Sequence, residues 1–231
     1  MKPILLYDID GTLLQVHSLF LRPLIAQHLT EMGLSKPESM NRSFAGRTDR
    51  GIFMELIEGH PSPDELFNVL KRKYVKTMVE QLSSDRVERF DEAIESVHIA
   101  KEAGYHVGLC TGNFREVAFA KVNTVGLNDM FSFGGFGCNH ANRNFLPESA
   151  HNDFQTIHGH SPNAEQYVII GDTPKDILCA KYFGACVIAV TTGGFTREEL
   201  QKHDPDFVLD DLSNPKEWLD KLEQVTRASR T

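Results

Sequence analysis

Three short, mostly apolar runs that each end in a polar turn constrain this chain more than any other feature. Residues 3–7, 106–110 and 167–170 are such runs, and each is followed at once by aspartate, threonine or glycine. Short apolar runs without alternation are typical of strands that are buried on both faces, as in a parallel sheet. The sequence therefore predicts a fold built around a parallel sheet whose strands end in polar loops.

The pattern of apolar residues changes near Val87. Between residues 17 and 84, apolar residues recur at helical spacing in three stripes, without a strand-like run among them. After Val87, helical and strand-like segments alternate, which is typical of a parallel sheet with helices on both faces. We therefore expect an α/β protein with a doubly wound parallel sheet, formed by residues 1–15 and 88–231, and an inserted α-helical cap domain at residues 16–87.

Apolar spacing, together with glycine and proline stops, also predicts the individual elements of this fold. The helices are expected to end at glycines or prolines, and each strand is expected to precede a turn. The expected strands lie at 3–7, 106–110, 131–133, 167–170, 186–190 and 207–209, and the expected helices lie near 21–32, 52–57, 66–78, 90–97, 117–125, 147–158 and 177–183.

Composition excludes several classes of function. The 231 residues include 24 lysines and arginines against 32 aspartates and glutamates, a formal net charge of −8. Proteins that bind nucleic acids or anionic membranes usually present a basic face, so we expect neither partner. The apolar runs are too short to span a bilayer, and the four cysteines have no CxxC spacing. We expect a cytoplasmic protein that is a monomer or a weak dimer.

Four aspartates follow two of the predicted strands: Asp8 and Asp10 after the first, Asp172 and Asp176 after the strand at 167–170. Ligands of doubly wound sheets bind at the carboxyl ends of strands, where neighbouring strands would bring the four together. Two like charges about 4 Å apart repel by roughly 4 kcal/mol at an effective dielectric constant near 20. A cluster of this kind therefore needs protons or a cation. Oxygen ligands without a Cys or His cluster suit Mg²⁺, which is the cofactor we predict.

A second strand end offers groups that could hold a phosphate. Thr111, Gly112 and Asn113 follow the strand at 106–110 and precede a predicted helix. Backbone N–H groups at a helix N-terminus bind phosphoryl oxygens well, and Mg²⁺ usually keeps sites for substrate phosphates. The sequence therefore predicts a site for a small phosphorylated metabolite.

These residues resemble a known family. Residues 8–13 (Asp-Ile-Asp-Gly-Thr-Leu), the pair Thr111-Gly112, and Gly171-Asp172 with Asp176 are similar to three of the four motifs of the haloacid dehalogenase (HAD) superfamily, in matching order. The helical insertion resembles the cap of the subgroup that contains phosphoglycolate phosphatase and β-phosphoglucomutase. The resemblance covers the whole chain and implies a Rossmann-like core.

The resemblance also implies a mechanism. Asp8 is the expected nucleophile, which forms an aspartyl-phosphate, and Asp10 is the expected general acid and base. The expected metal ligands are the Asp8 carboxylate, the Asp10 carbonyl and Asp172, with Asp176 as a direct or indirect partner. Relatives that cleave carbon–halogen bonds lack the second aspartate, so Asp10 favours phosphoryl transfer. We predict a phosphatase that hydrolyses a small phosphate monoester.

The third motif departs from the family pattern, which places a lysine before the Gly-Asp pair. The chain has no lysine between Lys121 and Lys175, and the basic residue nearest the expected position is Arg143. An arginine there could bridge the phosphoryl oxygens and Asp8 through its planar fork. Arg143 is the predicted catalytic residue, and Lys121 and Lys175 stay open as alternatives.

Further residues are predicted to contact the substrate. Arg47 lies in a glycine-containing loop before a cap helix, and loops of this kind close over the site in the related enzymes. Lys175, Gly112 and Asn113 are the other expected substrate contacts. Two alternative functions stay open: a sugar-phosphate phosphotransferase of the mutase type with the same aspartates, and a binding module without catalysis.

Overall fold

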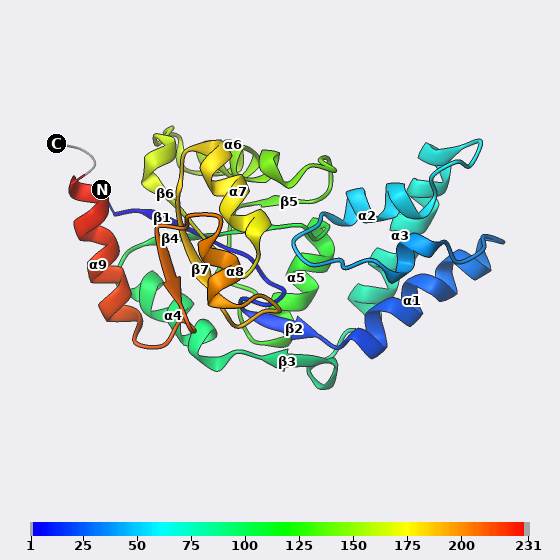
Figure 1. Cartoon of the computed structure of the whole chain (residues 1–231), viewed down its shortest axis with the longest axis horizontal. Helices are drawn as coiled ribbons and strands as arrows, with labels where there is room; N and C mark the ends of the chain where they lie inside the picture. Colours follow the sequence, from blue (N-terminus) through cyan, green and yellow to red (C-terminus); the bar gives the residue numbers. More distant parts are fainter. Residues whose placement is uncertain (1, 229–231) are drawn as a thin grey trace.

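A six-stranded parallel sheet forms the centre of the molecule (Figure 1). The structure is a computed structural model that describes residues 2–228, with side chains described up to residue 224. The strand order is β5-β4-β1-β6-β7-β8, and every neighbouring pair is parallel. The strands are β1 (Ile4–Tyr7), β4 (His106–Thr111), β5 (Gly134–Phe136), β6 (Tyr167–Gly171), β7 (Cys186–Val190) and β8 (Phe207–Leu209).

The first strand, β1, lies between β4 and β6, and its side chains are buried on both faces. Leu5 and Tyr7 pack into the hydrophobic cluster on one face, whereas Ile4 and Leu6 pack into the cluster on the other. A strand covered on both sides needs apolar residues at every position, which explains the unbroken run at the start of the chain.

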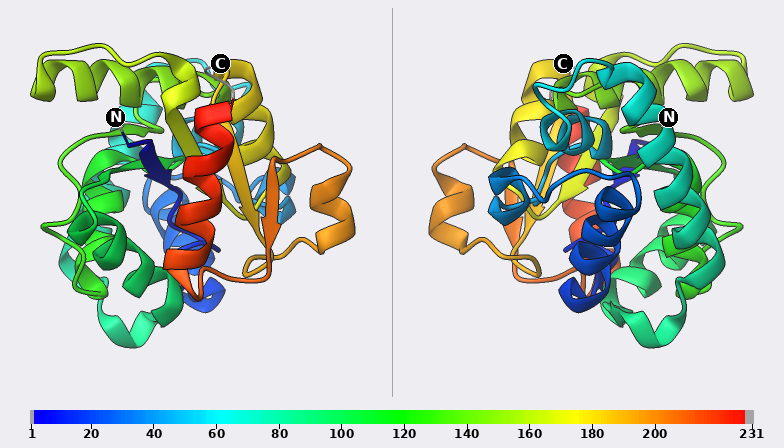
Figure 2. Two further views of the ribbon diagram at one scale, coloured as in Figure 1. Left: turned by 90° about the vertical axis from the view of Figure 1, so that its left-hand side faces the viewer. Right: turned by 90° about the vertical axis from the view of Figure 1, so that its right-hand side faces the viewer.

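Helices cover both faces of the sheet, as Figure 2 shows. One face carries α4 (Asp91–Glu102), α5 (Arg115–Thr124) and α9 (Pro215–Ala228), which share a core with β1 and β4. The other face carries α6 (Leu146–His158), α7 (Pro174–Phe183) and α8 (Arg197–Gln201). The prediction of a doubly wound α/β core is confirmed. No helix within residues 2–228 is both long and apolar enough to span a membrane.

A group of three helices extends from the sheet at the side where β1 ends (Figure 1). These are α1 (Ser18–Glu31), α2 (Asp49–Leu56) and α3 (Pro63–Gln81), and they share a third hydrophobic cluster. Phe114 at the start of α5 lies inside this cluster, with its ring 5.4 Å from that of Phe53. The division into a core at 1–15 and 88–231 and a cap at 16–87 stays a prediction.

The structure contains a small two-stranded sheet that the sequence analysis did not predict. Strand β2 (Leu14–Val16) pairs antiparallel with β3 (Val87–Arg89), where the chain enters and leaves the helical group. Each strand has only three residues, so neither shows a clear alternation of apolar and polar positions. Residues 2–228 also contain four short 3₁₀ helices: η1 (Glu38–Asn41), η2 (Ser84–Arg86), η3 (Arg143–Phe145) and η4 (Ala164–Gln166).

The strand expected at residues 131–133 lies instead at Gly134–Phe136 (β5). Phe131 and Phe133 are buried, and their apolar side chains drew the prediction to the wrong residues. A Cβ atom on Gly135 would lie 1.9 Å from the carbonyl oxygen of Leu146, so this strand needs a glycine where α6 packs closely. Glycine carries no strand signal in a sequence pattern.

Candidate functional site

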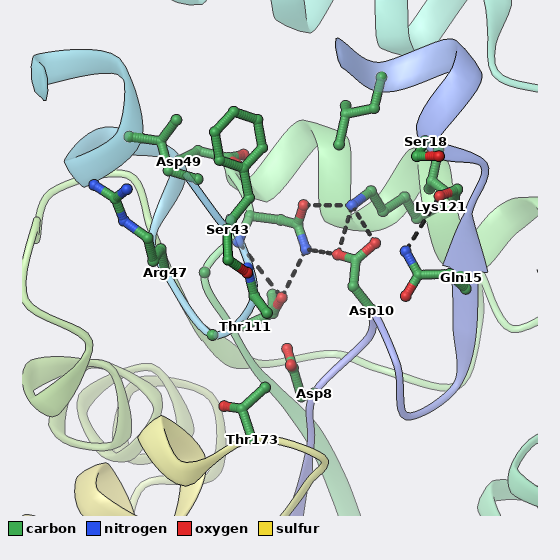
Figure 3. A pocket seen from close by; sticks show the side chains of 18 of the residues that line it. Asp8, Asp10, Gln15, Ser18, Ser43, Arg47, Asp49, Thr111, Lys121 and Thr173 are labelled. Carbon is green, nitrogen blue, oxygen red and sulfur yellow. Dashed lines mark hydrogen bonds and ion pairs between the residues drawn. The ribbon is translucent and has the colours of Figure 1, made fainter. Parts of the chain in front are cut away.

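The carboxyl ends of three adjacent strands, β1, β4 and β6, open into a cavity of about 330 Å³. The strand ends line one side of this cavity and the helices α1–α3 line the other. Figure 3 shows Asp8 and Thr173 on the strand side, and Ser18, Arg47 and Asp49 on the helical side. The sheet order therefore brings together turns that are far apart in the sequence.

Three buried carboxylates meet at the strand side of the cavity. Asp8 follows β1, Asp172 follows β6, and Asp176 lies in the first turn of α7; one oxygen of each lies within 4.8 Å of the others. Burial raises the pKa of Asp8 to about 6, and it raises the pKa of Asp172 well above its usual value, with Asp176 and Asp8 adding repulsion. This cluster is therefore short of positive charge.

Local sequence holds two of these carboxylates in place. Asp176 accepts hydrogen bonds from the backbone N–H of Thr173 at 3.0 Å and from its hydroxyl at 2.7 Å, in a capping box that begins α7. Gly11 has a φ of +83°, and a Cβ atom there would lie 2.3 Å from an oxygen of Asp172. The glycine after Asp10 therefore allows the turn to pass directly against the Asp172 carboxylate.

Arg143 lies against the acidic cluster. Its guanidinium is 3.2 Å from an oxygen of Asp8, pairs closely with Asp176, and donates to the carbonyl oxygen of Cys110 at 3.2 Å. Arg143, Asp8 and Asp176 are all buried, so little water screens the two ion pairs and both are strong. Of the three basic residues considered for the third motif, Arg143 is the one that contacts the Asp8 carboxylate.

Lys121 and Asn113 hold the side chain of Asp10. The ammonium of Lys121 lies 2.7 Å and 2.6 Å from the two oxygens of Asp10, and 2.7 Å from the amide oxygen of Asn113. The amide nitrogen of Asn113 donates to Asp10 and to the hydroxyl of Thr111, both at 2.8 Å. The Asp10 carboxylate is therefore fixed on the cap side of the cavity and is not one of the three that cluster around Asp8.

The start of α2 docks onto the loop that contains Gly112. The backbone N–H of Asp49 donates to the carbonyl oxygen of Gly112 at 2.7 Å, and the Asp49 carboxylate accepts from the backbone N–H of Phe114 at 2.8 Å. A Cβ atom on Gly112 would lie 2.0 Å from the carbonyl oxygen of Arg47, so the cap loop fits only against a glycine. Burial raises the pKa of Asp49 to about 6.

The two remaining predicted substrate contacts differ in position. Arg47 lines the cavity and pairs with Glu55 of α2. Lys175 is exposed and lines a separate cavity of about 270 Å³ together with Arg47 and Arg143. Among the described residues, no hydrogen bond or ion pair holds Lys175, and partial burial lowers its pKa. Eight of the ten predicted site residues therefore line the main cavity, Asp176 lies next to it in the carboxylate cluster, and Lys175 lies beside it.

Sequence reasoning missed two features of the site, the contact of Asp49 with α5 and the ion pair of Lys121 with Asp10. Lys121 is four residues after Val117 and four before Val125, so it occupies the buried side of α5. A lysine in an apolar stripe needs a buried carboxylate partner, and this signal could have found the pair. No local sequence pattern predicts the hydrogen bond between Asp49 and Phe114, because the two residues are 65 positions apart.

The three clustered carboxylates fit a divalent cation. They supply hard oxygen ligands only, their mutual repulsion raises the pKa of Asp172, and Arg143 is the one cation that contacts them within the described residues. Asp8, Asp172 and Asp176 are thus the residues that could hold a metal ion.

Comparisons with known proteins extend over nearly the whole chain. A family model described as haloacid dehalogenase-like hydrolase matches residues 5–190. The chain is 26% identical over 219 residues to the probable phosphatase IndB of Dickeya dadantii, covering 92% of this chain and 91% of that protein. It is 24% identical over 216 residues to a phosphoglycolate phosphatase of Mesorhizobium japonicum, covering 90% of each. A β-phosphoglucomutase structure from Clostridium difficile superposes with a TM-score of 0.71 at 15% identity, covering 99% of this chain and 100% of that one.

Proposed function

The chain belongs to the haloacid dehalogenase-like hydrolase family, and on that basis we propose that it is a Mg²⁺-dependent phosphatase of a small phosphate monoester. The observation that carries this proposal is the cluster of Asp8, Asp172 and Asp176 around one point, with Arg143 against Asp8. The named phosphatases among the relatives support phosphate ester chemistry.

In the proposed first step, a carboxylate oxygen of Asp8 attacks the phosphorus atom of the substrate. The new oxygen–phosphorus bond forms as the bond between phosphorus and the ester oxygen breaks, which leaves an aspartyl-phosphate. Arg143, which lies 3.2 Å from Asp8, orients the nucleophile and stabilises negative charge on the phosphoryl oxygens. Thr111 and the backbone N–H groups that follow it contact the same oxygens.

Asp10 is the proposed proton donor and acceptor. It gives its proton to the departing ester oxygen, and it then takes a proton from the water that attacks the aspartyl-phosphate. Attack by water breaks the bond to Asp8 and releases inorganic phosphate. Lys121 and Asn113 keep the Asp10 carboxylate on the cap side of the cavity, where the ester oxygen departs.

The proposed metal ligands are the carboxylates of Asp8 and Asp172 and the backbone carbonyl of Asp10, with Asp176 next to them. When it is bound there, Mg²⁺ supplies positive charge next to the transferring phosphoryl group. The oxygen-only ligand set supports Mg²⁺ over softer metals.

The test is an assay of phenyl phosphate hydrolysis with and without EDTA. The proposal predicts release of inorganic phosphate in Mg²⁺, loss of activity in EDTA, and recovery when Mg²⁺ is added in excess. Activity that persists in EDTA contradicts the proposal. Little free phosphate together with transfer to an added alcohol would assign the chain to phosphotransfer instead.

A further inference from the structure

The cap side of the main cavity forms a chamber where the alcohol part of a substrate must lie. We use the name leaving-group chamber for the part of the 330 Å³ cavity that α1, α2, α3 and residues 43–47 line. Its position follows from the mechanism, because Asp8 lies at the strand end and Asp10 lies between Asp8 and the cap (Figure 3). Most of its wall is apolar, from side chains of all three helices and the preceding loop: Leu21, Ile25, Phe44, Ile52, Phe53 and Tyr74.

Two of the charged side chains on this wall are paired within the protein. Arg47 binds Glu55, and the side chains of the two are only 20% and 16% exposed. Lys121 is 2% exposed and binds both oxygens of Asp10. Glu55 also pairs with Arg42, so Arg42 and Arg47 share one carboxylate. A substrate anion could bind Arg47 or Lys121 only by displacing a carboxylate that already holds the cation.

Arg22 is the third cation on the wall, and both terminal nitrogens of its guanidinium already donate to backbone carbonyl oxygens. One guanidinium nitrogen donates to the carbonyl oxygen of Met40 and the other donates to that of Arg42 at 2.8 Å. The guanidinium lies over the ring of Phe44, 4.2 Å from the ring centre. These contacts direct Arg22 toward the backbone of the loop after α1, where it holds the chamber wall together.

The polar groups that stay available on the wall are neutral. The hydroxyl groups of Tyr74 and Ser18 line the cavity, and neither makes a hydrogen bond within the described part of the chain. The Asp49 carboxylate lines the same cavity, accepts a hydrogen bond from the backbone N–H of Phe114, and would repel an anion when it is ionised. An anionic group in the chamber would therefore lose its water, and it could reach a cation only by displacing contacts that Arg22, Arg47 and Lys121 already make.

We propose that the leaving group of the substrate is a small neutral alcohol with an apolar face, and that carboxylate and phosphate groups are excluded from the chamber. This inference rests on the proposed function, since it concerns the ester that the phosphatase hydrolyses. The apolar wall recognises the hydrocarbon part, and the hydroxyls of Tyr74 and Ser18 hydrogen-bond to neutral polar groups of the alcohol. A cavity of about 330 Å³ is small for a ligand site, so the alcohol is small as well.

The experiment compares three phosphate esters at saturating Mg²⁺: 2-phosphoglycolate, the phosphate ester of glycolamide, and isobutyl phosphate. The first two have almost the same size and differ in the charge of the leaving group. We expect kcat/KM for the glycolamide ester to exceed that for 2-phosphoglycolate by roughly 10-fold to 100-fold. Isobutyl phosphate should be hydrolysed at least as well as the glycolamide ester.

Substitutions at Leu21 test whether the chamber wall sets this preference. Leu21→Lys adds a cation to the wall, and Leu21→Gln is its neutral polar control. The ratio of kcat/KM for 2-phosphoglycolate over the glycolamide ester should rise about 10-fold in Leu21→Lys and stay near the wild-type ratio in Leu21→Gln. Ser18→Lys places the same charge at an exposed position on the wall and should shift the ratio in the same direction.

Three outcomes separate the possible failures. A wild-type preference for 2-phosphoglycolate over the glycolamide ester overturns the inference but leaves the phosphatase proposal intact. If Lys175→Met then removes that preference, the carboxylate of 2-phosphoglycolate binds in the neighbouring cavity that Lys175 lines. An unchanged ratio in folded Leu21→Lys and Ser18→Lys also overturns it. Failure of the wild type to hydrolyse any of the three esters contradicts the proposed function itself.

Discussion

The strand side and the cap side of the cavity are built in different ways. On the strand side, Asp8, Asp172 and Arg143 are nearly fully buried, and their charges interact mainly with one another and not with water. On the cap side, Arg47 and Lys121 are paired with carboxylates, and most of the remaining wall is apolar. In the proposed mechanism, the strand ends would carry the chemistry and the helical group would select the alcohol. Substitutions on the strand side should therefore affect every substrate equally, whereas those on the cap side should change the ratio between substrates.

The largest effect is expected for Asp8→Asn. The amide cannot form the aspartyl-phosphate, so kcat should fall by at least about 10³-fold for every phosphate ester that the wild type hydrolyses. Steady-state assays with phenyl phosphate and isobutyl phosphate measure this loss, and Asp85→Asn, at an exposed position far along the chain, is the matched control. If kcat falls for only one of the two esters, the strand side does not act on every substrate equally, which contradicts the proposed difference between the strand side and the cap side.

The second effect concerns Arg143→Met. This substitution leaves the buried carboxylates of Asp8 and Asp176 without their cation, so the free energy of unfolding should fall by about 3–5 kcal/mol. Urea unfolding measures the change, and added Mg²⁺ should recover part of it by binding the folded state. Arg89→Met is the control, because it removes an exposed ion pair with Asp91 that is worth at most about 1 kcal/mol. Equal losses in the two variants would contradict the account.

A smaller effect is expected for Lys121→Met, which frees the Asp10 carboxylate. The kcat should fall by roughly 10-fold to 100-fold with little change in KM, because Asp10 loses its orientation and not its chemistry. The control is Lys76→Met, at an exposed position on α3. A higher KM with unchanged kcat would show that Lys121 binds substrate, contrary to its position against Asp10.

The smallest effect is a pH dependence of stability at Asp49. Its pKa is raised to about 6 in the folded protein, chiefly because burial disfavours the charged form, so the folded state binds the proton more tightly than the unfolded state. The stability linked to this proton is present below about pH 4 and is lost as the pH rises through 6. An increase from 3.8 to about 6 corresponds to at most about 3 kcal/mol.

Urea unfolding of the wild type and of Asp49→Asn between about pH 4.5 and about pH 7.5 measures this dependence. The variant keeps an oxygen that can accept from the backbone N–H of Phe114 and has no carboxyl proton to lose. The free energy of unfolding of Asp49→Asn, relative to that of the wild type, should therefore increase as the pH rises. Parallel curves for the two proteins would show that Asp49 titrates normally.

The sequence predicted the strand side far better than the cap side, for a physical reason. Asp8 and Asp172 directly follow apolar strands, so local pattern and the order of a parallel sheet were enough to place them. The cap side depends on contacts between distant segments, such as Asp49 with Phe114 and Lys121 with Asp10. The strand at residues 134–136 was misplaced because close packing of α6 demands glycine there. Where a position is set by packing between distant segments, local pattern can show that a residue is buried, as for Lys121, but it does not identify the residue's partner.

The central claim is that Asp8 receives the phosphoryl group in a site completed by a divalent cation. Acid quenching of the enzyme during turnover of isobutyl phosphate, followed by mass spectrometry of its peptides, tests this claim directly. The account predicts a phosphorylated peptide in which Asp8 carries the modification, formed with Mg²⁺ and absent with EDTA. Phosphorylation of another residue, or the same labelling in EDTA, would contradict it.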